Sequence, residues 1–84
     1  MPKVEVYGAD WCGYSLRARA LLEKKGVEYQ LIDVDSTPGA RDEMVERGGG
    51  RTIPQIFVDG TPIGGCDEIH ALEERGELDR LIAE

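Results

Sequence analysis

The sequence predicts one α/β domain, residues 1–84, with a four-stranded mixed sheet covered by helices on both faces. Two observations favour this fold class. The first half of the chain alternates between strand-like and helical hydrophobic patterns within about 30 residues, which is the length of a βαβ unit. The second half carries Asp59-Gly60, a strong two-residue hairpin signal, between two short apolar runs.

The N-terminal half is expected to form the βαβ unit. Val4 and Val6 lie on one face of a first strand, and Leu16, Ala20 and Leu21 recur with the spacing of a helix. Strands joined by such a crossover are parallel. The expected strand, helix and strand span residues 3–7, 14–25 and 27–35.

The C-terminal half adds a helix, a hairpin and a last helical segment. Thr37 and Pro38 suit the cap and first position of a helix, and Asp67 is the expected cap of the last one, which Gly76 interrupts. The expected elements are a helix to about residue 47, strands at 55–58 and 61–64, and a helical segment to residue 82. This order is the thioredoxin-type architecture, which does not by itself determine function.

Composition excludes several function classes. The net charge is -7, which argues against nucleic acids and anionic membranes as partners. No apolar run reaches the roughly 18 residues of a membrane span. The N-terminus has no apolar leader-like run, so we expect no secretory signal and a cytoplasmic location.

Cys12 is the candidate nucleophile. It lies between the first strand and the first helix, where the unpaired amides of a helix N-terminus favour the thiolate. Cysteines in this position have pKa values of roughly 3.5–7.5, against about 8.5 for a free thiol. Arg17 and Arg19 are expected to add positive charge nearby. The alternative is a structural cysteine that happens to begin a helix. No His/Cys group has zinc spacing.

Ser15 stands where a second sulfur would close an intramolecular disulfide with Cys12. A mixed disulfide on Cys12 must therefore be resolved by an outside thiol or by Cys66. Ser15 either donates a hydrogen bond to the thiolate or is simply a polar residue of the first turn. A serine here is also what an engineered replacement of a resolving cysteine would leave.

Other residues carry two interpretations each. Cys66 is a buried apolar residue or an accessory redox thiol, and Pro54 is a functional proline or an ordinary edge-strand proline. Trp11 and Tyr14 wall a groove or pack beside the helix. His70, the single histidine, is a weak candidate partner for Cys12.

The chain resembles the glutaredoxins over nearly its whole length. Three segments carry the resemblance: Trp-Cys-Gly-Tyr-Ser at residues 11–15, Thr-Ile-Pro-Gln-Ile-Phe at 52–57 and Gly-Gly-Cys-Asp at 64–67. The resemblance implies a thioredoxin fold, Cys12 as nucleophile and a cis Pro54. It also implies glutathione contacts from Thr52, Ile53, Pro54, Gly65, Cys66 and Asp67. We add Tyr14 and Arg51 as further candidate contacts.

The chain departs from the family pattern at two places. Many dithiol glutaredoxins have Cys-Pro-Tyr-Cys, whereas this chain has Cys-Gly-Tyr-Ser at residues 12–15. A lysine that pairs with the glycyl carboxylate of glutathione is here Ala9. We expect Arg47 or Arg51 to supply that charge instead.

The resemblance therefore implies a glutathione-dependent thiol–disulfide oxidoreductase. It would remove glutathione from proteins or small disulfides by a monothiol route on Cys12, with Ser15 beside it, and it would act as a monomer. The first alternative is a dimeric carrier whose two Cys12 thiolates and two glutathiones hold a 2Fe–2S cluster. The second alternative is a disabled structural domain.

Overall fold

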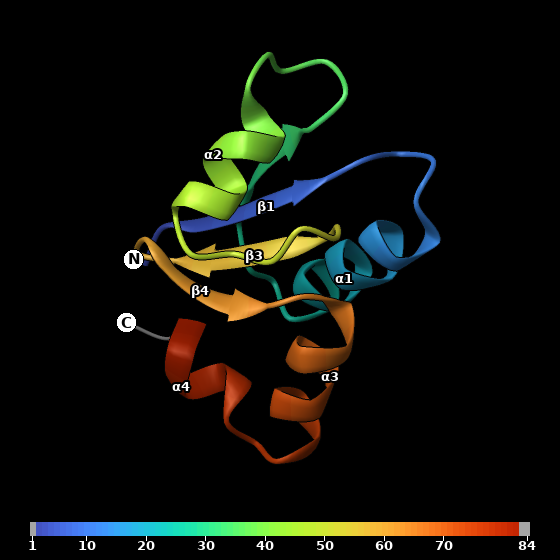
Figure 1. The fold of residues 1–84 in the computed structure, drawn as a ribbon. Coiled ribbons are helices and arrows are strands. Elements are labelled where there is room, and N and C mark those ends of the chain that lie inside the picture. Colours follow the sequence, from blue (N-terminus) through green and yellow to red (C-terminus); the bar gives the residue numbers. More distant parts are fainter. Residues whose placement is uncertain (1, 83–84) are drawn as a thin grey trace.

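The computed structural model describes residues 2–82, which form one four-stranded sheet with four helices (Figure 1). The elements in chain order are β1 (Val4–Gly8), α1 (Gly13–Lys24), β2 (Gln30–Asp33), α2 (Ala40–Glu46), β3 (Gln55–Val58), β4 (Thr61–Gly64), α3 (Cys66–Glu74) and α4 (Leu78–Ile82). No helix within residues 2–82 is long and apolar enough to cross a bilayer.

The sheet has the strand order β2-β1-β3-β4 and is mixed, as predicted. β1 runs parallel to β2 and antiparallel to β3, and β3 pairs with β4 in an antiparallel hairpin. Asp59 and Gly60 turn this hairpin with positive φ angles of 50° and 83°, the signature of a primed turn. β2 is shorter than the expected 27–35, because Val27 still donates its N–H to the carbonyl of Leu22 and so belongs to the end of α1.

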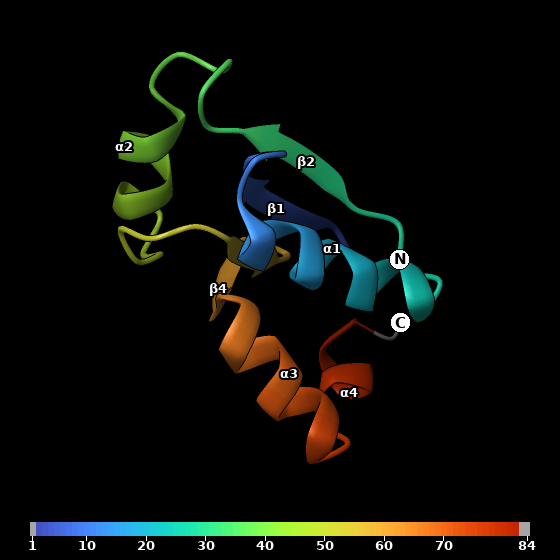
Figure 2. The ribbon, with the colours of Figure 1, turned by 90° about the vertical axis from the view of Figure 1, so that its right-hand side faces the viewer.

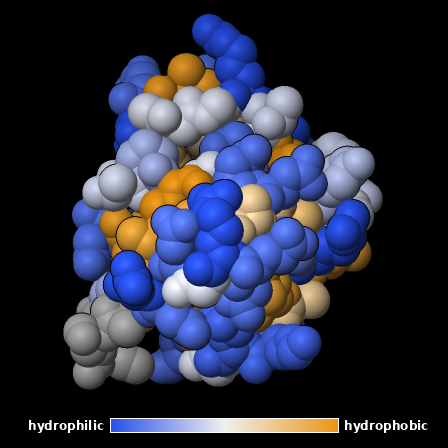
Figure 3. Space-filling view, turned by 90° about the horizontal axis from the view of Figure 1, so that it is seen from below, coloured by the Kyte–Doolittle hydropathy of each residue, from blue (hydrophilic) through white to orange (hydrophobic). Residues whose placement is uncertain are grey.

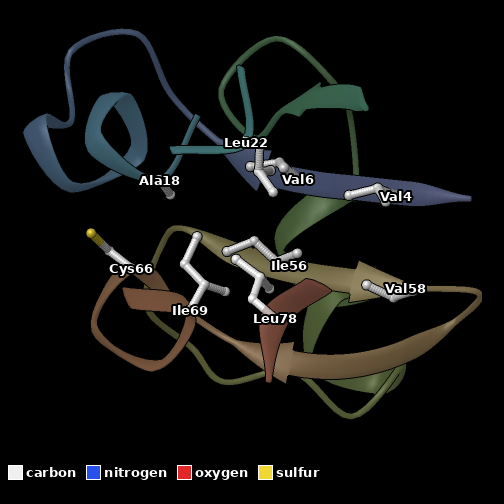
Figure 4. Close-up of a cluster of buried hydrophobic side chains, with 9 residues drawn as sticks. All are labelled: Val4, Val6, Ala18, Leu22, Ile56, Val58, Cys66, Ile69 and Leu78. Carbon is white, nitrogen blue, oxygen red and sulfur yellow. The ribbon is translucent and has the colours of Figure 1, made fainter. Parts of the chain in front are cut away.

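Helices cover both faces of the sheet, which confirms the predicted layers (Figure 2). One face of β1 and β3 packs against α1, α3 and α4, and the other packs against α2. All five residues of β1 are therefore buried. The first core cluster, shown in Figure 4, contains Val4, Val6, Ala18, Leu22, Ile56, Val58, Cys66, Ile69 and Leu78. The second contains Tyr7, Ala9, Cys12, Val34, Ala40, Met44 and Phe57.

The buried face of α1 differs from the predicted stripe. Leu16 and Ala20 are exposed, whereas Ala18 and Leu22 are fully buried in line with Ser15. Ser15 is buried because its hydroxyl accepts a hydrogen bond from the N–H of Ala9 (3.3 Å). This contact with the end of β1 fixes the rotation of the helix, and hydrophobic spacing alone could not identify it.

The predicted cap of α2 was wrong. Gly39, with φ of 75°, is the N-cap, and the helix begins at Ala40 rather than at Pro38. The carbonyl of Thr37 accepts the N–H of Ala40 (3.1 Å), so Thr37 and Pro38 form a turn before the helix. Only a left-handed glycine allows the chain to pass from that turn into the helix at this point.

The last helical segment also differs from the prediction. Gly65, not Asp67, is the N-cap of α3, and its N–H donates to a carboxylate oxygen of Glu68 (2.7 Å). Gly76, with φ of 71°, then separates α3 from α4. Seen from the side of α3 and α4, the surface is mostly hydrophilic (Figure 3), as expected for a chain with a net charge of -7.

Candidate functional site

Cys12 lies at the junction predicted from the sequence. It is the N-cap of α1, with extended backbone angles, and its carbonyl accepts the N–H of Leu16 (3.1 Å). The residue is buried, with 9% of its surface exposed. Its Sγ lies 3.9 Å from the carbonyl oxygen of Ile53, directly before the cis proline. The thiol therefore faces the segment that precedes β3.

The pKa of Cys12 is lowered by hydrogen bonds. Burial raises the pKa, but the Ser15 hydroxyl and the amides of Ser15 and Tyr14 favour the thiolate and outweigh that effect. Because Ser15 Oγ already accepts the N–H of Ala9, its own proton is free to point at the sulfur. The interpretation of Ser15 as a donor to the thiolate is therefore better supported than that of a plain polar residue.

The arginines of α1 do not act as predicted. Arg17 is not among the groups that lower the pKa of Cys12; its guanidinium lies 6.0 Å from the ring centre of Tyr14. Arg19 forms an ion pair with Asp10 (2.8 Å) and a hydrogen bond to the hydroxyl of Tyr29 (3.1 Å). The thiolate is stabilised by local hydrogen bonds rather than by these charges.

A groove of about 440 Å³ opens between the segment before β3 and the start of α3. A side chain on Gly65 would come within 2.8 Å of the carbonyl oxygen of Pro54, so this glycine lets the two segments approach each other. The Ile53–Pro54 bond is cis, as the resemblance implied. The groove is lined by Tyr14, Thr52, Ile53, Pro54, Gly65, Cys66, Asp67 and Glu68. It thus gathers the predicted glutathione contacts except Arg51.

Glu68 is the groove residue that the sequence reasoning missed. Its carboxylate accepts the N–H of Gly65. The amides of Cys66 and Asp67, the first two residues of α3, have no partners within the helix, because they lie in its first turn. A glutamate three residues after a helix cap is a known sequence signal of a helix start. Glu68 therefore marks Gly65 as the cap, whereas the sequence analysis predicts Asp67.

Cys66 lines the groove but belongs to the core. It is 4% exposed and packs in the first cluster, and burial raises the pKa of its thiol. Its Sγ lies 3.6 Å from Nδ1 of His70, which is also 2.8 Å from the Cys66 carbonyl oxygen. His70 is therefore engaged with Cys66 rather than with Cys12, and the apolar interpretation of Cys66 is the better supported one.

Arg47 does not supply a charge to the groove. Its guanidinium donates to Glu5 (2.7 Å) and to the Tyr7 hydroxyl (2.7 Å), and it lies 4.4 Å from the ring centre of Phe57. This arrangement ties the end of α2 to the sheet, so the prediction of Arg47 as a glutathione contact was wrong. Arg51 is exposed beside Thr52 and stays a candidate.

Replacing Arg47 should therefore affect stability. We expect Arg47→Ala to lower the free energy of unfolding by about 2 kcal/mol, because it leaves the buried Glu5 carboxylate with only the more distant Lys3 ammonium group, 3.9 Å away. Arg51→Ala, at an exposed position, should change it by less than about 0.5 kcal/mol. Urea denaturation of both variants measures this difference. Equal, small losses would show that the Arg47–Glu5 pair contributes little.

A second hollow of similar volume, about 440 Å³, lies between the end of α1 and α4. The ammonium group of Lys25 there is already paired with Glu73 (2.7 Å) and Asp79 (2.8 Å). Its lining contains no thiol and no other strong nucleophile. We therefore place the functional site at Cys12 and the neighbouring groove between the segment before β3 and the start of α3.

Known proteins agree with this assignment. Residues 4–63 match the glutaredoxin family model, and a glutaredoxin of Pseudomonas aeruginosa is 46% identical over 83 residues, covering 99% of each chain. The chain belongs to the glutaredoxin family. Glutaredoxin 3 of Escherichia coli is 48% identical to it over 82 residues, covering 98% of this chain and 99% of the relative.

Solved structures place this glutaredoxin in the thioredoxin fold. The solution structure of a Brucella melitensis glutaredoxin has a TM-score of 0.84 at 48% identity and covers 98% of this chain and 89% of its own. A buckwheat glutaredoxin–glutathione complex has a TM-score of 0.88 at 28% identity, and the match covers 96% of this chain and 76% of the buckwheat chain. Family and fold together make this glutaredoxin a thiol–disulfide oxidoreductase, in agreement with the sequence prediction.

Proposed function

We propose that this glutaredoxin removes glutathione from mixed disulfides by a monothiol route. The observation that carries the proposal is the Cys12 thiol, whose pKa is lowered, whose sulfur faces the carbonyl of the groove residue Ile53, and which has serine rather than cysteine at position 15. A similar glutaredoxin has been solved as a complex with glutathione, which supports glutathione as the ligand of this groove.

The reaction is two successive thiol–disulfide exchanges. The Cys12 thiolate attacks the glutathionyl sulfur; the bond to the substrate sulfur breaks, and the substrate leaves as a thiolate that takes a proton from water. The thiolate of a second glutathione then attacks the glutathionyl sulfur on Cys12. This step releases glutathione disulfide and restores the Cys12 thiolate. Over both steps, one mixed disulfide and one free glutathione give one substrate thiol and one glutathione disulfide, so the free glutathione supplies the two electrons.

The groove offers groups suited to each part of glutathione. The backbone of Ile53, which faces the Cys12 sulfur, suits the cysteinyl unit. The first amides of α3, at Cys66 and Asp67, suit the carboxylate of the γ-glutamyl unit. Arg51, beside the groove, is the candidate for the glycyl carboxylate. These assignments form part of the proposal.

The test is turnover of the mixed disulfide between glutathione and 2-mercaptoethanol, with glutathione as reductant. We expect activity from the parent and from Cys66→Ser, and none above background from Cys12→Ser. The Cys66→Ser control separates the two thiols. A parent without activity would favour the disabled domain, and activity that survives in Cys12→Ser would assign the chemistry to another group.

The 2Fe–2S alternative would take one Cys12 thiolate from each of two chains and two glutathione thiolates. Because no observation on residues 2–82 favours that assembly, we propose disulfide exchange alone.

A further inference from the structure

Large apolar side chains are exposed at positions close to the nucleophile in the sequence. Within residues 2–82, four large hydrophobic residues are markedly exposed: Trp11 (69%), Tyr14 (57%), Leu16 (46%) and Leu81 (40%). The first three lie within four positions of Cys12, and we call them the apolar collar. Of these three, Tyr14 alone lines the groove. The collar therefore extends beyond the surface that a glutathione in the groove would cover.

Trp11 is exposed but held in place. Its indole N–H donates to the carboxylate of Asp35, in the loop after β2, and that carboxylate also lies 3.7 Å from the guanidinium of Arg41. A large aromatic side chain that is fixed before binding loses little conformational freedom when a partner covers it. Such a residue is suited to anchor a macromolecular partner.

A cation lies next to the collar. Arg17 stacks against Tyr14 and forms no ion pair in the described part of the chain, whereas Arg19 on the same helix is paired with Asp10. In a protein with a net charge of -7, an arginine without an ion pair next to the groove residue Tyr14 offers a local positive charge. It complements an acidic residue on a partner.

Given the proposed function, the chemistry places the leaving group over this surface. In thiol–disulfide exchange the attacking, central and leaving sulfurs lie nearly in line. With glutathione in the groove, the polypeptide bound to the leaving sulfur must lie outside the groove, next to Cys12. A small leaving thiol would touch little of the collar, whereas a polypeptide would cover it.

We propose that the apolar collar and Arg17 dock the polypeptide of a glutathionylated protein, recognising an apolar and an acidic side chain near its modified cysteine. The exchange itself is unchanged: the bond between glutathione and the partner's cysteine breaks, the Cys12–glutathione bond forms, and the partner's cysteine leaves as a thiolate that takes a proton from water. The docking surface raises the specificity for proteins over small disulfides.

The test compares a peptide with a small substrate. The peptide carries a glutathionylated cysteine between leucine and aspartate, and the small substrate is the mixed disulfide of glutathione with 2-mercaptoethanol. We expect the double variant Trp11→Ala/Leu16→Ala to lose about tenfold in kcat/KM on the peptide, the effect of truncating interface anchors. It should stay within about twofold on the small substrate. Leu81→Ala, the exposed leucine on α4, is the matched control and should change neither value.

The role of Arg17 needs a second comparison. We expect the parent to prefer the aspartate peptide over one with lysine at that position, and Arg17→Glu to reverse the preference. Equal losses on peptide and small substrate would overturn the docking surface, because they would show an effect on Cys12 itself. Unchanged peptide kinetics would also overturn it. A parent inactive on both substrates would contradict the proposed function as well.

Discussion

Glutathione disulfide is expected to convert the parent into a stable Cys12–glutathione adduct and the Ser15→Cys variant into an intramolecular disulfide. In the parent, the first exchange leaves glutathione on Cys12, and no sulfur lies one helical turn away to displace it. The adduct should therefore persist until free thiol is added. Intact-mass spectrometry distinguishes the gain of one glutathione from the loss of two hydrogens.

The structure supports ring closure in the variant. The side chain at position 15 already approaches the Cys12 sulfur, since its hydroxyl lowers the pKa of that thiol. Gly8 also leaves room for a sulfur at position 15. A Cβ atom at Gly8 would lie 2.8 Å from Ser15 Oγ, so any larger residue there would crowd this side chain. The variant should therefore gain the ability to reduce protein disulfides, which requires a second thiol to resolve the intermediate.

Cys66 is the internal thiol that could contradict this result. It begins α3, packs in the core beside His70 and has a raised pKa, so we expect it not to resolve Cys12. A Cys66→Ser variant is the control and should form the same adduct as the parent. A parent that loses two hydrogens, with the loss abolished in Cys66→Ser, would show that Cys66 resolves Cys12 and that the route is dithiol.

Local signals predicted the fold well. The hairpin was predictable because Asp59-Gly60 tolerates the two positive φ angles that its turn requires. Cys12 was found at a helix start because the break after β1 and the helical pattern are both visible in the sequence. These features depend on neighbours within a few positions, so sequence patterns contain them.

Features that depend on distant contacts were missed. Leu16 and Leu22 are equally apolar, and the contact between Ser15 and Ala9 decides which of them is buried. Arg47 was assigned to the groove on charge alone, yet Glu5, forty-two positions away, binds its guanidinium. Side chains compete for partners in three dimensions, and spacing along the chain does not record that competition.

Ser15→Ala should raise the pKa of Cys12 and slow its alkylation near neutral pH. Burial raises the pKa of this thiol, and the Ser15 hydroxyl is the foremost of the groups that lower it, so its loss shifts the balance toward the protonated form. Arg17→Gln should leave the pKa unchanged, because Arg17 does not contribute to it. The rate of alkylation by iodoacetamide, measured as a function of pH, gives the pKa of Cys12 in both variants.

The direction of the pH dependence follows from the lowered pKa. The thiolate is present above the folded-state pKa of Cys12 and is lost as the pH falls through it, so the parent should begin to react at a lower pH than a free thiol, which titrates at about 8.5. Because the folded protein holds the thiolate better than the unfolded chain does, the free energy of unfolding of the reduced protein should rise between the folded-state pKa and about 8.5. Cys12→Ser should lack this rise. The hydroxyl would be shown not to stabilise the thiolate by either of two results. The pH midpoint of alkylation for the parent would lie near that of a free thiol, or it would be the same in the parent and in Ser15→Ala.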